Sequence, residues 1–146
     1  MISVGRPWFS IRSGLPALYD CIMRTAESGR LGEWRRTVVR PAEDDVLEIA
    51  AGTGLDFPHY RAGVTVVATE ADLNMLELAR SRAERAEATI VLVAADAQAL
   101  PFRDRSFDTV VVGLGLCTIP SPPLAKASGL NSSHDAVIQG GQSAAN

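Results

Sequence analysis

Residues 46–54 read Val-Leu-Glu-Ile-Ala-Ala-Gly-Thr-Gly, an apolar run that passes into a glycine loop. The run Val46–Ala50 predicts a short buried strand, preceded by an acidic turn. Gly52 and Gly54 let the backbone turn sharply and approach a ligand closely. A helix is expected to begin between Asp56 and Arg61. Strand, glycine loop and helix in this order are typical of α/β folds that bind ligands at a helix N-terminus.

The rest of the chain extends this pattern in both directions. Apolar runs without alternation predict buried strands, and apolar positions at helical spacing predict helices between them. The further strands are expected over 64–69, 89–94 and 107–116, and the helices over 15–27, 32–40 and 71–88. This order predicts an α/β protein, a Rossmann-like three-layer αβα fold with a parallel but incomplete sheet of about four strands. In the helix over 32–40, Arg35, Arg36 and Arg40 are expected largely on the solvent side.

The domain organisation is simple. A chain of 146 residues has the size of one domain. We expect an irregular N-terminus over 1–13, a ligand-binding domain over 14–120 and a low-complexity tail over 121–146. The tail holds mostly small and polar residues, so it is expected to be disordered.

Composition excludes several classes of protein. Hydrophobic residues make up 47%, charged residues 21%, and the formal net charge is −3, which fits a globular protein and not a nucleic-acid binder. The longest apolar run, 109–119, is too short for a membrane span, and residues 1–10 hold no signal-peptide core. Cys21 and Cys117 lie too far apart to indicate a disulfide framework or a metal site. We therefore expect a cytoplasmic protein with no metal and no integral membrane segment.

The glycine loop excludes two common nucleotide sites. The dinucleotide pattern G-x-G-x-x-G fails because Phe57 stands at the third glycine, and no Walker Gly-Lys-Ser/Thr follows. This disfavours a nicotinamide dinucleotide protein. Glu48 places a carboxylate beside the loop, where it would repel a pyrophosphate but suit an ammonium or sulfonium cation. S-adenosylmethionine carries both cations, together with a carboxylate for the helix N-terminus.

Two more acids end neighbouring strands. Glu70 follows the second strand and can accept both hydroxyls of a ribose, and Asp96 follows the third and can accept an adenine amino group beside the Ala97 amide. Each acid alone is more typical of a turn or a helix cap, as expected of Asp72. All of them in register with a glycine loop predict a pocket for an adenosyl ligand in the crevice where open α/β sheets bind ligands.

At this point the chain resembles the class I S-adenosylmethionine-dependent methyltransferases. It is similar to the type 11 group that includes the ubiquinone/menaquinone methyltransferases. The resemblance covers roughly residues 18–120 and rests on residues 46–54, on 66–70 with 74–76, and on 95–102 with 106–108. Leu116–Ile119 is similar to a subgroup with thiol and phospholipid methyltransferase-like members.

The resemblance implies S-adenosylmethionine as cofactor and a role for each matching residue. Glu48, Gly52 and Gly54 would hold the methionine moiety, with Ala50 and Thr53 as loop backbone. Glu70 would bind the ribose. The residues near the adenine or the sulfonium would be Ala71, Met75, Asp96, Ala97, Gly113 and Leu114. The implied reaction is transfer of the sulfonium methyl to a small-molecule or lipid-like acceptor.

The chain also departs from the family. Ala50 stands where the family usually has glycine, and nothing after Pro120 matches the family's later helix and strands. We therefore expect a truncated domain whose fourth strand is a bare apolar edge, prone to self-association or low stability. The alternative to an enzyme is a non-catalytic remnant that binds the cofactor weakly or not at all.

No catalytic residue can be named from the sequence. His59 and His134 are the only histidines. His59, at the junction of loop and helix, could face the pocket as a general base, but a surface or capping role is expected, and His134 in the tail is given no role. Tyr19 and Trp34 are expected to be packing residues, and Cys117 a buried thiol.

Overall fold

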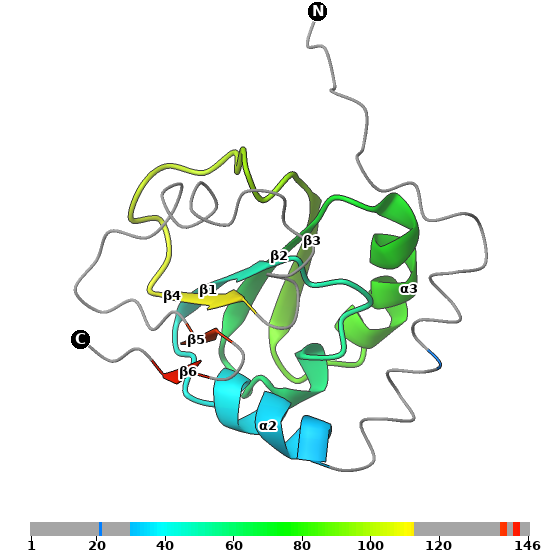
Figure 1. Ribbon diagram of the computed structural model, residues 1–146, viewed down its shortest axis with the longest axis vertical. Coiled ribbons are helices and arrows are strands. Elements are labelled where there is room, and N and C mark those ends of the chain that lie inside the picture. Colours follow the sequence, from blue (N-terminus) through cyan, green and yellow to red (C-terminus); the bar gives the residue numbers. More distant parts are fainter. Residues whose placement is uncertain (1–20, 22–29, 113–137, 140–141, 144–146) are drawn as a thin grey trace, which may run out of the picture.

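The computed structural model describes Cys21 and residues 30–112, 138–139 and 142–143 (Figure 1). The helices are α2 (Arg30–Val39), the 3-10 helix η1 (Phe57–His59) and α3 (Leu73–Ala83). The strands are β1 (Asp45–Ile49), β2 (Thr65–Glu70), β3 (Thr89–Ala94), β4 (Thr109–Val112), β5 (Ile138–Gln139) and β6 (Gln142–Ser143). The predicted helix over 15–27 and the N-terminus over 1–13 lie outside the described residues, apart from the exposed Cys21.

The sheet has the order β3-β2-β1-β4-β5-β6. β3, β2, β1 and β4 are all parallel, which confirms the predicted Rossmann-like class and its four main strands. The chain builds outward from β1 to β3 and then returns to pair β4 with the other side of β1. The order therefore reverses between β1 and β4, and open α/β sheets bind ligands at the carboxyl ends of strands at such a point.

The far edge of β4 differs from the expectation. Ile138 of β5 pairs with Val111 in parallel, and β6 pairs with β5 in antiparallel, so β4 is not the last strand of the sheet. All of β4 is buried. The prediction of a bare fourth strand is thus wrong at this position. An edge strand presents unpaired backbone N–H and C=O groups, which favour the addition of a further strand. In the sequence, Val137-Ile138 is an apolar pair within a polar segment.

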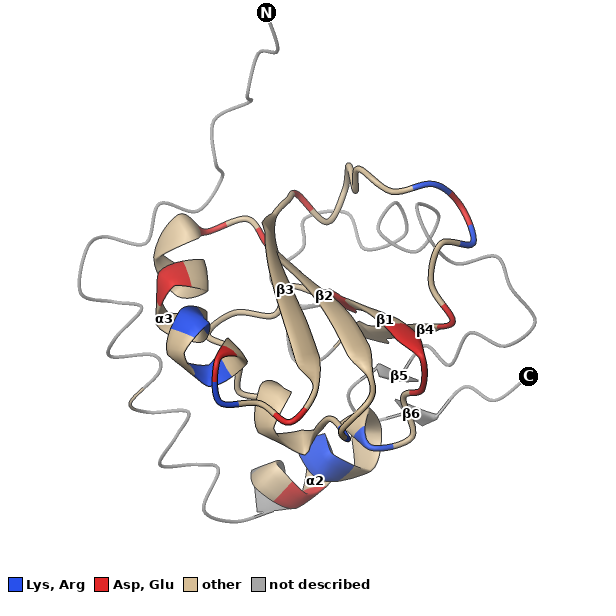
Figure 2. Cartoon of the chain, turned by 180° about the vertical axis from the view of Figure 1, so that it is seen from behind, with Lys and Arg blue, Asp and Glu red and all other residues tan. Residues whose placement is uncertain are grey.

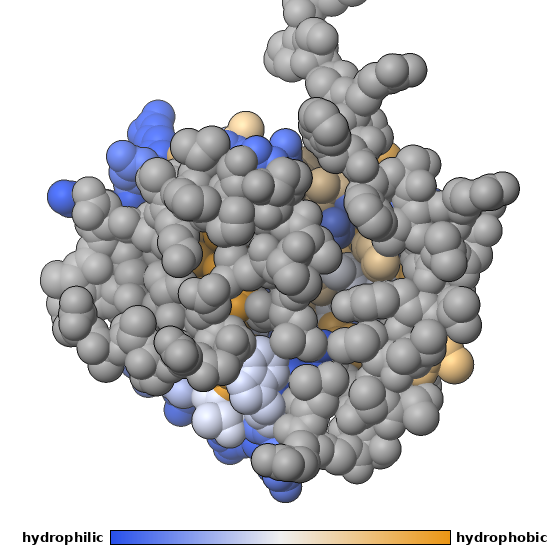
Figure 3. Space-filling model, in the orientation of Figure 1, coloured by the Kyte–Doolittle hydropathy of each residue, from blue (hydrophilic) through white to orange (hydrophobic). Residues whose placement is uncertain are grey.

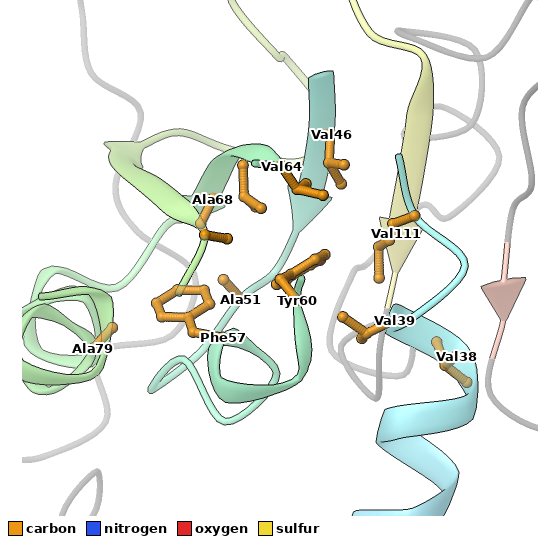
Figure 4. Packing of buried hydrophobic residues seen from close by; sticks show 13 residues of the cluster. Val38, Val39, Val46, Ala51, Phe57, Tyr60, Val64, Ala68, Ala79 and Val111 are labelled. Carbon is orange, nitrogen blue, oxygen red and sulfur yellow. The ribbon is translucent and has the colours of Figure 1, made fainter. Parts of the chain in front are cut away.

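One face of the sheet carries the helices and the larger core cluster. Val38 and Val39 of α2, Phe57 and Tyr60 around η1, and Ala79 of α3 pack onto the side chains of the strands. Figure 4 shows the rings of Phe57 and Tyr60 inside this cluster, with Phe57 towards Ala79. Both helices also carry acidic and basic residues (Figure 2), so each has a polar side.

The opposite face is covered, among the described residues, by the loop that joins β3 to β4. Leu47, Ile49, Val110 and Val112 form its buried centre. The loop packs Ala97, Leu100, Phe102 and Phe107 against them, and the two phenylalanine rings meet edge to face at 5.1 Å. Residues 103–106 at the loop tip are exposed, and hydrophilic side chains gather there in Figure 3.

Two elements are shorter than expected. Between Asp56 and Arg61 only the three-residue η1 forms, with a proline in its first turn that cannot donate a backbone hydrogen bond. α3 ends at Ala83 instead of continuing to Ala88, because the amides of Arg85 and Ala86 bond to carbonyls three residues back and the chain turns toward β3. No helix among the described residues is long and apolar enough to cross a membrane.

Candidate functional site

The glycine loop leaves β1 through a left-handed backbone. Ala50, Gly52 and Gly54 have φ values of 56°, 58° and 76°. A Cβ on Gly54 would lie 2.4 Å from the Phe57 ring, so the core itself requires glycine there. A Cβ on Gly52 would meet nothing within 4 Å, so its left-handed backbone, and no neighbouring atom, favours glycine at that position. Gly52 is therefore where a ligand can approach the backbone closely.

Glu70 holds the loop from the end of β2. One carboxylate oxygen accepts from the Gly52 amide at 2.9 Å, and the other accepts from the amides of Ala71 and Asp72 at 2.9 and 3.0 Å. Asp72 in turn caps α3 by accepting from the Asn74 amide at 2.8 Å, as predicted. Glu70 thus links β2, the glycine loop and the start of α3 through charge-assisted hydrogen bonds.

α3 supplies a second fixed point. The Arg82 guanidinium donates to the Thr53 carbonyl at 2.7 Å. Met75 is buried on the same helix, whereas Ala71, just before it, is exposed. Arg82 was not predicted as a site residue, because no pattern in the sequence distinguishes it.

Asp96 lies at the same edge of the sheet. The Ala95 amide donates to the Glu70 carbonyl at 3.1 Å, which brings the ends of β2 and β3 together. Asp96 is exposed and accepts from the Gln98 amide at 2.8 Å, a turn-forming bond. Ala97 is half-buried against the second core cluster.

Glu48 lies in a buried cluster of polar side chains. It is 1% exposed, and one carboxylate oxygen accepts from the Tyr60 hydroxyl at 3.0 Å. Its other oxygen is buried without a hydrogen-bond partner. Burial raises the pKa of Glu48 well above its ordinary value, and the neighbouring Asp56 carboxylate raises it further. Burial likewise raises the pKa of Tyr60, so its hydroxyl stays a neutral donor.

Asp56 is paired with a residue that sequence reasoning placed wrongly. Arg35 is 5% exposed, not on the solvent side, and donates to Asp56 at 2.8 Å. Arg36 and Arg40 are exposed as predicted. The signal was present, because Arg35 precedes the buried Val38 and Val39 by three and four positions and so shares their side of the helix.

The structure thus brings most of the predicted residues to one edge of the sheet. Glu48, the glycine loop, Glu70, Asp96 and Ala97 follow neighbouring parallel strands or belong to them. Gly113, Leu114, Tyr19, Cys117 and His134 lie outside the described residues. His59 is half-buried in η1, and Trp34 packs against the core as expected. No cluster of potential metal ligands occurs among the residues the structure describes.

A family model described as a methyltransferase domain matches residues 46–141. The chain belongs to the S-adenosylmethionine-dependent methyltransferases. This confirms the family that the sequence resembles, and S-adenosyl-L-methionine is the cofactor of that family.

Curated relatives and solved structures agree with this methyltransferase assignment. The chain is 38% identical over 114 residues to a demethylmenaquinone methyltransferase of Renibacterium salmoninarum, covering 75% of this chain and 46% of the relative. Its identity to the demethylmenaquinone methyltransferase of Streptomyces griseus is 34% over 122 residues, covering 80% and 51%. The chain therefore spans about half the length of these relatives.

Two solved methyltransferases share the fold. A Thermotoga maritima enzyme described as a possible histamine N-methyltransferase superposes with a TM-score of 0.61 at 22% identity, covering 79% of this chain and 53% of that one. A glycopeptide N-methyltransferase complexed with S-adenosyl-L-methionine gives a TM-score of 0.51 at 29% identity, covering 66% and 46%.

The described residues fit this cofactor. Open space faces Gly52, and the Glu70 carboxylate lies at the same loop. The buried Glu48 oxygen without a partner is an acceptor that a cationic ligand could use. Carboxylates beside a glycine loop can accept hydrogen bonds from an ammonium and from ribose hydroxyls and can balance the charge of a sulfonium.

Proposed function

We propose that this methyltransferase domain binds S-adenosylmethionine at the glycine loop and transfers its methyl group to a lipid-like acceptor. The observation that carries the proposal is the Glu70 carboxylate bonded to the Gly52 amide, beside a loop position that has open space. An acid in this position is preorganised by three backbone donors and needs little rearrangement to accept ribose hydroxyls.

Each predicted residue has a place in this proposal. Glu48 and the backbone of 50–54 would hold the methionine moiety, and Ala71, Met75, Asp96 and Ala97 would surround the adenine. Gly113 and Leu114 would lie near the sulfonium. The bound cofactor would supply an activated methyl on sulfur, and the protein's own contribution would be to align it and exclude water.

The acceptor is proposed from the relatives alone. Two of them are named demethylmenaquinone methyltransferases, so demethylmenaquinone is the first acceptor to test. Because the chain spans about half of these relatives, the reaction is tested on the chain as it stands and separately from cofactor binding.

Calorimetric titration with S-adenosylmethionine and S-adenosylhomocysteine tests the binding step. We expect saturable binding by the wild type and at least a tenfold loss for Glu70→Ala. Glu77→Ala is the matched control, because Glu77 is an exposed glutamate on α3 that forms a surface ion pair with Arg80. Equal affinity of the two variants would contradict the proposed pocket.

Transfer of a labelled methyl group to demethylmenaquinone tests the reaction. Binding together with transfer supports the full proposal. Binding without transfer to this or any related quinone would leave a cofactor-binding domain and would favour the non-catalytic alternative.

A further inference from the structure

The two glycines of the loop are each preceded by a peptide unit whose orientation the glycine itself does not fix. Gly52 and Gly54 have φ values of 58° and 76°, and glycine adopts positive and negative φ about equally well. A flip of the peptide unit changes the φ of the glycine and exchanges the directions of the C=O and N–H groups. Contacts from other parts of the chain therefore decide which of these groups faces the open space at Gly52.

The peptide unit before Gly52 is held through its N–H group. The Gly52 amide donates to the Glu70 carboxylate at 2.9 Å. The same carboxylate accepts from the amides of Ala71 and Asp72, so it is itself fixed just before α3. A flip of this peptide unit would place the Ala51 carbonyl opposite a carboxylate, where two acceptors repel each other.

The peptide unit before Gly54 is held through its C=O group, by a side chain of the opposite charge. The Arg82 guanidinium of α3 donates to the Thr53 carbonyl at 2.7 Å, and Thr53 is 2% exposed. At the other end of the unit, the Gly54 amide donates to the Ala51 carbonyl at 3.0 Å. A flip would break both bonds and turn an N–H group toward the guanidinium. Arg82 thus stabilises the observed orientation through a charge-assisted hydrogen bond.

Arg82 differs in this contact from the arginines that flank it. Arg80 is exposed, and its ion pair lies within α3. Arg85 is exposed and bonds to Ser81, four residues earlier. Arg82 is half-buried and follows the buried Ala79 by three positions, so it lies on the side of α3 that packs against the core.

We propose that Arg82 is a positioning residue of the cofactor pocket, which acts through the Thr53 carbonyl and keeps the glycine loop in the orientation that S-adenosylmethionine requires. This inference rests on the proposed function, because it assigns that orientation to cofactor binding. A carbonyl oxygen turned toward the ligand would repel the carboxylate of the methionine moiety. Arg82 holds this oxygen toward α3 and so acts through the loop, not as a contact of the ligand.

Amide hydrogen exchange of the whole chain, followed by NMR, tests the effect on the loop. Arg82→Met removes the charged donor and keeps a long unbranched side chain. We expect the Gly54 amide to exchange about tenfold faster in this variant. The Val66 amide, in β2 between two paired strands, should keep its rate. Arg80→Met, on the exposed side of the same helix, is the matched control and should change neither rate.

Calorimetric titration with S-adenosylmethionine and S-adenosylhomocysteine tests the effect on binding. In conditions where circular dichroism shows every variant folded, Arg82→Met should lose about tenfold in affinity for both ligands, whereas Arg80→Met should match the wild type. Arg82→Lys restores a charged donor on a similar unbranched stem, so it should recover most of the affinity and slow the exchange of Gly54. If Arg82→Met does not fold, Arg82→Gln, with a shorter and neutral side chain, should give the same losses.

The outcomes separate the two proposals. Faster exchange of Gly54 and weaker binding in Arg82→Met, both reversed in Arg82→Lys, support the positioning role. The role is overturned, and cofactor binding stands, if Arg82→Met binds as tightly as the wild type or if Arg82→Lys is no better than Arg82→Met. Equal acceleration of exchange at Gly54 and Val66 also overturns it, because the variant then weakens the whole domain. Absence of any saturable heat with either ligand in the wild type overturns both proposals.

Discussion

Glu48 and Glu70 are both glutamates near the carboxyl ends of neighbouring parallel strands, yet the protein treats them differently. Glu70 is partly exposed and its two oxygens accept three backbone hydrogen bonds. Glu48 is fully buried and has one hydrogen bond, from Tyr60. The position in the sheet is therefore not what decides the chemistry of an acid. Its burial and the donors that the neighbouring elements bring to it decide whether it is held by several backbone amides, as Glu70 is, or has its pKa raised, as Glu48 has.

The largest expected loss of stability comes from removing the buried partner of Asp56, near Glu48. Arg35→Met removes the partner of Asp56 and leaves a buried carboxylate without its counter-charge, so the free energy of unfolding should fall by about 3–5 kcal/mol. Urea denaturation measures it. Arg36→Met, on the exposed side of α2, should change stability by less than about 0.5 kcal/mol.

A double variant checks that charge is the cause. Arg35→Met with Asp56→Asn removes both charges and should recover part of the loss. If the double variant is less stable than Arg35→Met alone, the guanidinium contributes mainly through packing.

Substitution of the partly exposed Glu70 should cost less stability. Glu70→Gln keeps one acceptor oxygen but places an amide group opposite a backbone donor, so at least one of the three backbone amides loses its partner. The expected loss is about 1–3 kcal/mol by urea denaturation. Glu77→Gln on the surface of α3 is the control, with an expected change near zero. A loss larger than that of Arg35→Met would reverse the comparison.

The pH dependence of stability tests the buried Glu48 directly. The folded pKa of Glu48 is raised above its ordinary value of 4.5, so the folded state binds more protons than the unfolded state above that pH. Its contribution to stability is fully present below 4.5 and is lost as the pH rises through the folded value.

Glu48→Gln should remove this loss. Glutamine keeps the acceptor for Tyr60 and is uncharged, as the protonated acid is. We expect the variant to be more stable than the wild type at pH 7–8 by roughly 0.5–2 kcal/mol, a gain of the size seen when functional strain is removed. Melting temperatures recorded across pH should converge at low pH. A variant less stable at every pH would contradict a protonated Glu48.

Much of the fold and some of the site could be predicted from the sequence, for identifiable reasons. β1, β2 and β3 are continuous apolar runs, and their pattern depends on local residues alone. Glu70 and Asp96 were correctly predicted to lie at the carboxyl ends of the strands, because each stands at or just after the end of a predicted strand. Arg35 was missed as a buried residue, since a charged side chain in a helix is usually exposed unless a partner is known. Asp56 and Tyr60 come together with Arg35 only through contacts between α2, η1 and β1. The sequence of one segment alone does not predict such contacts.

The smallest expected change in stability concerns the backbone at Ala50, which lies between the two glutamates in the sequence. Ala50 has a φ of 56°, in the left-handed region that penalises a Cβ, and it is the position at which the family usually has glycine. Ala50→Gly relieves that strain but adds chain entropy in the unfolded state, so the net gain should be about 0.5–1 kcal/mol. Ala51→Gly is the matched control, because Ala51 is buried in the core and has no positive φ, and it should lose stability instead. Opposite signs for adjacent alanines would show that the strain lies at the exit of β1. Equal losses would mean that the Ala50 methyl contributes packing, with the second core cluster that it touches, that outweighs the strain.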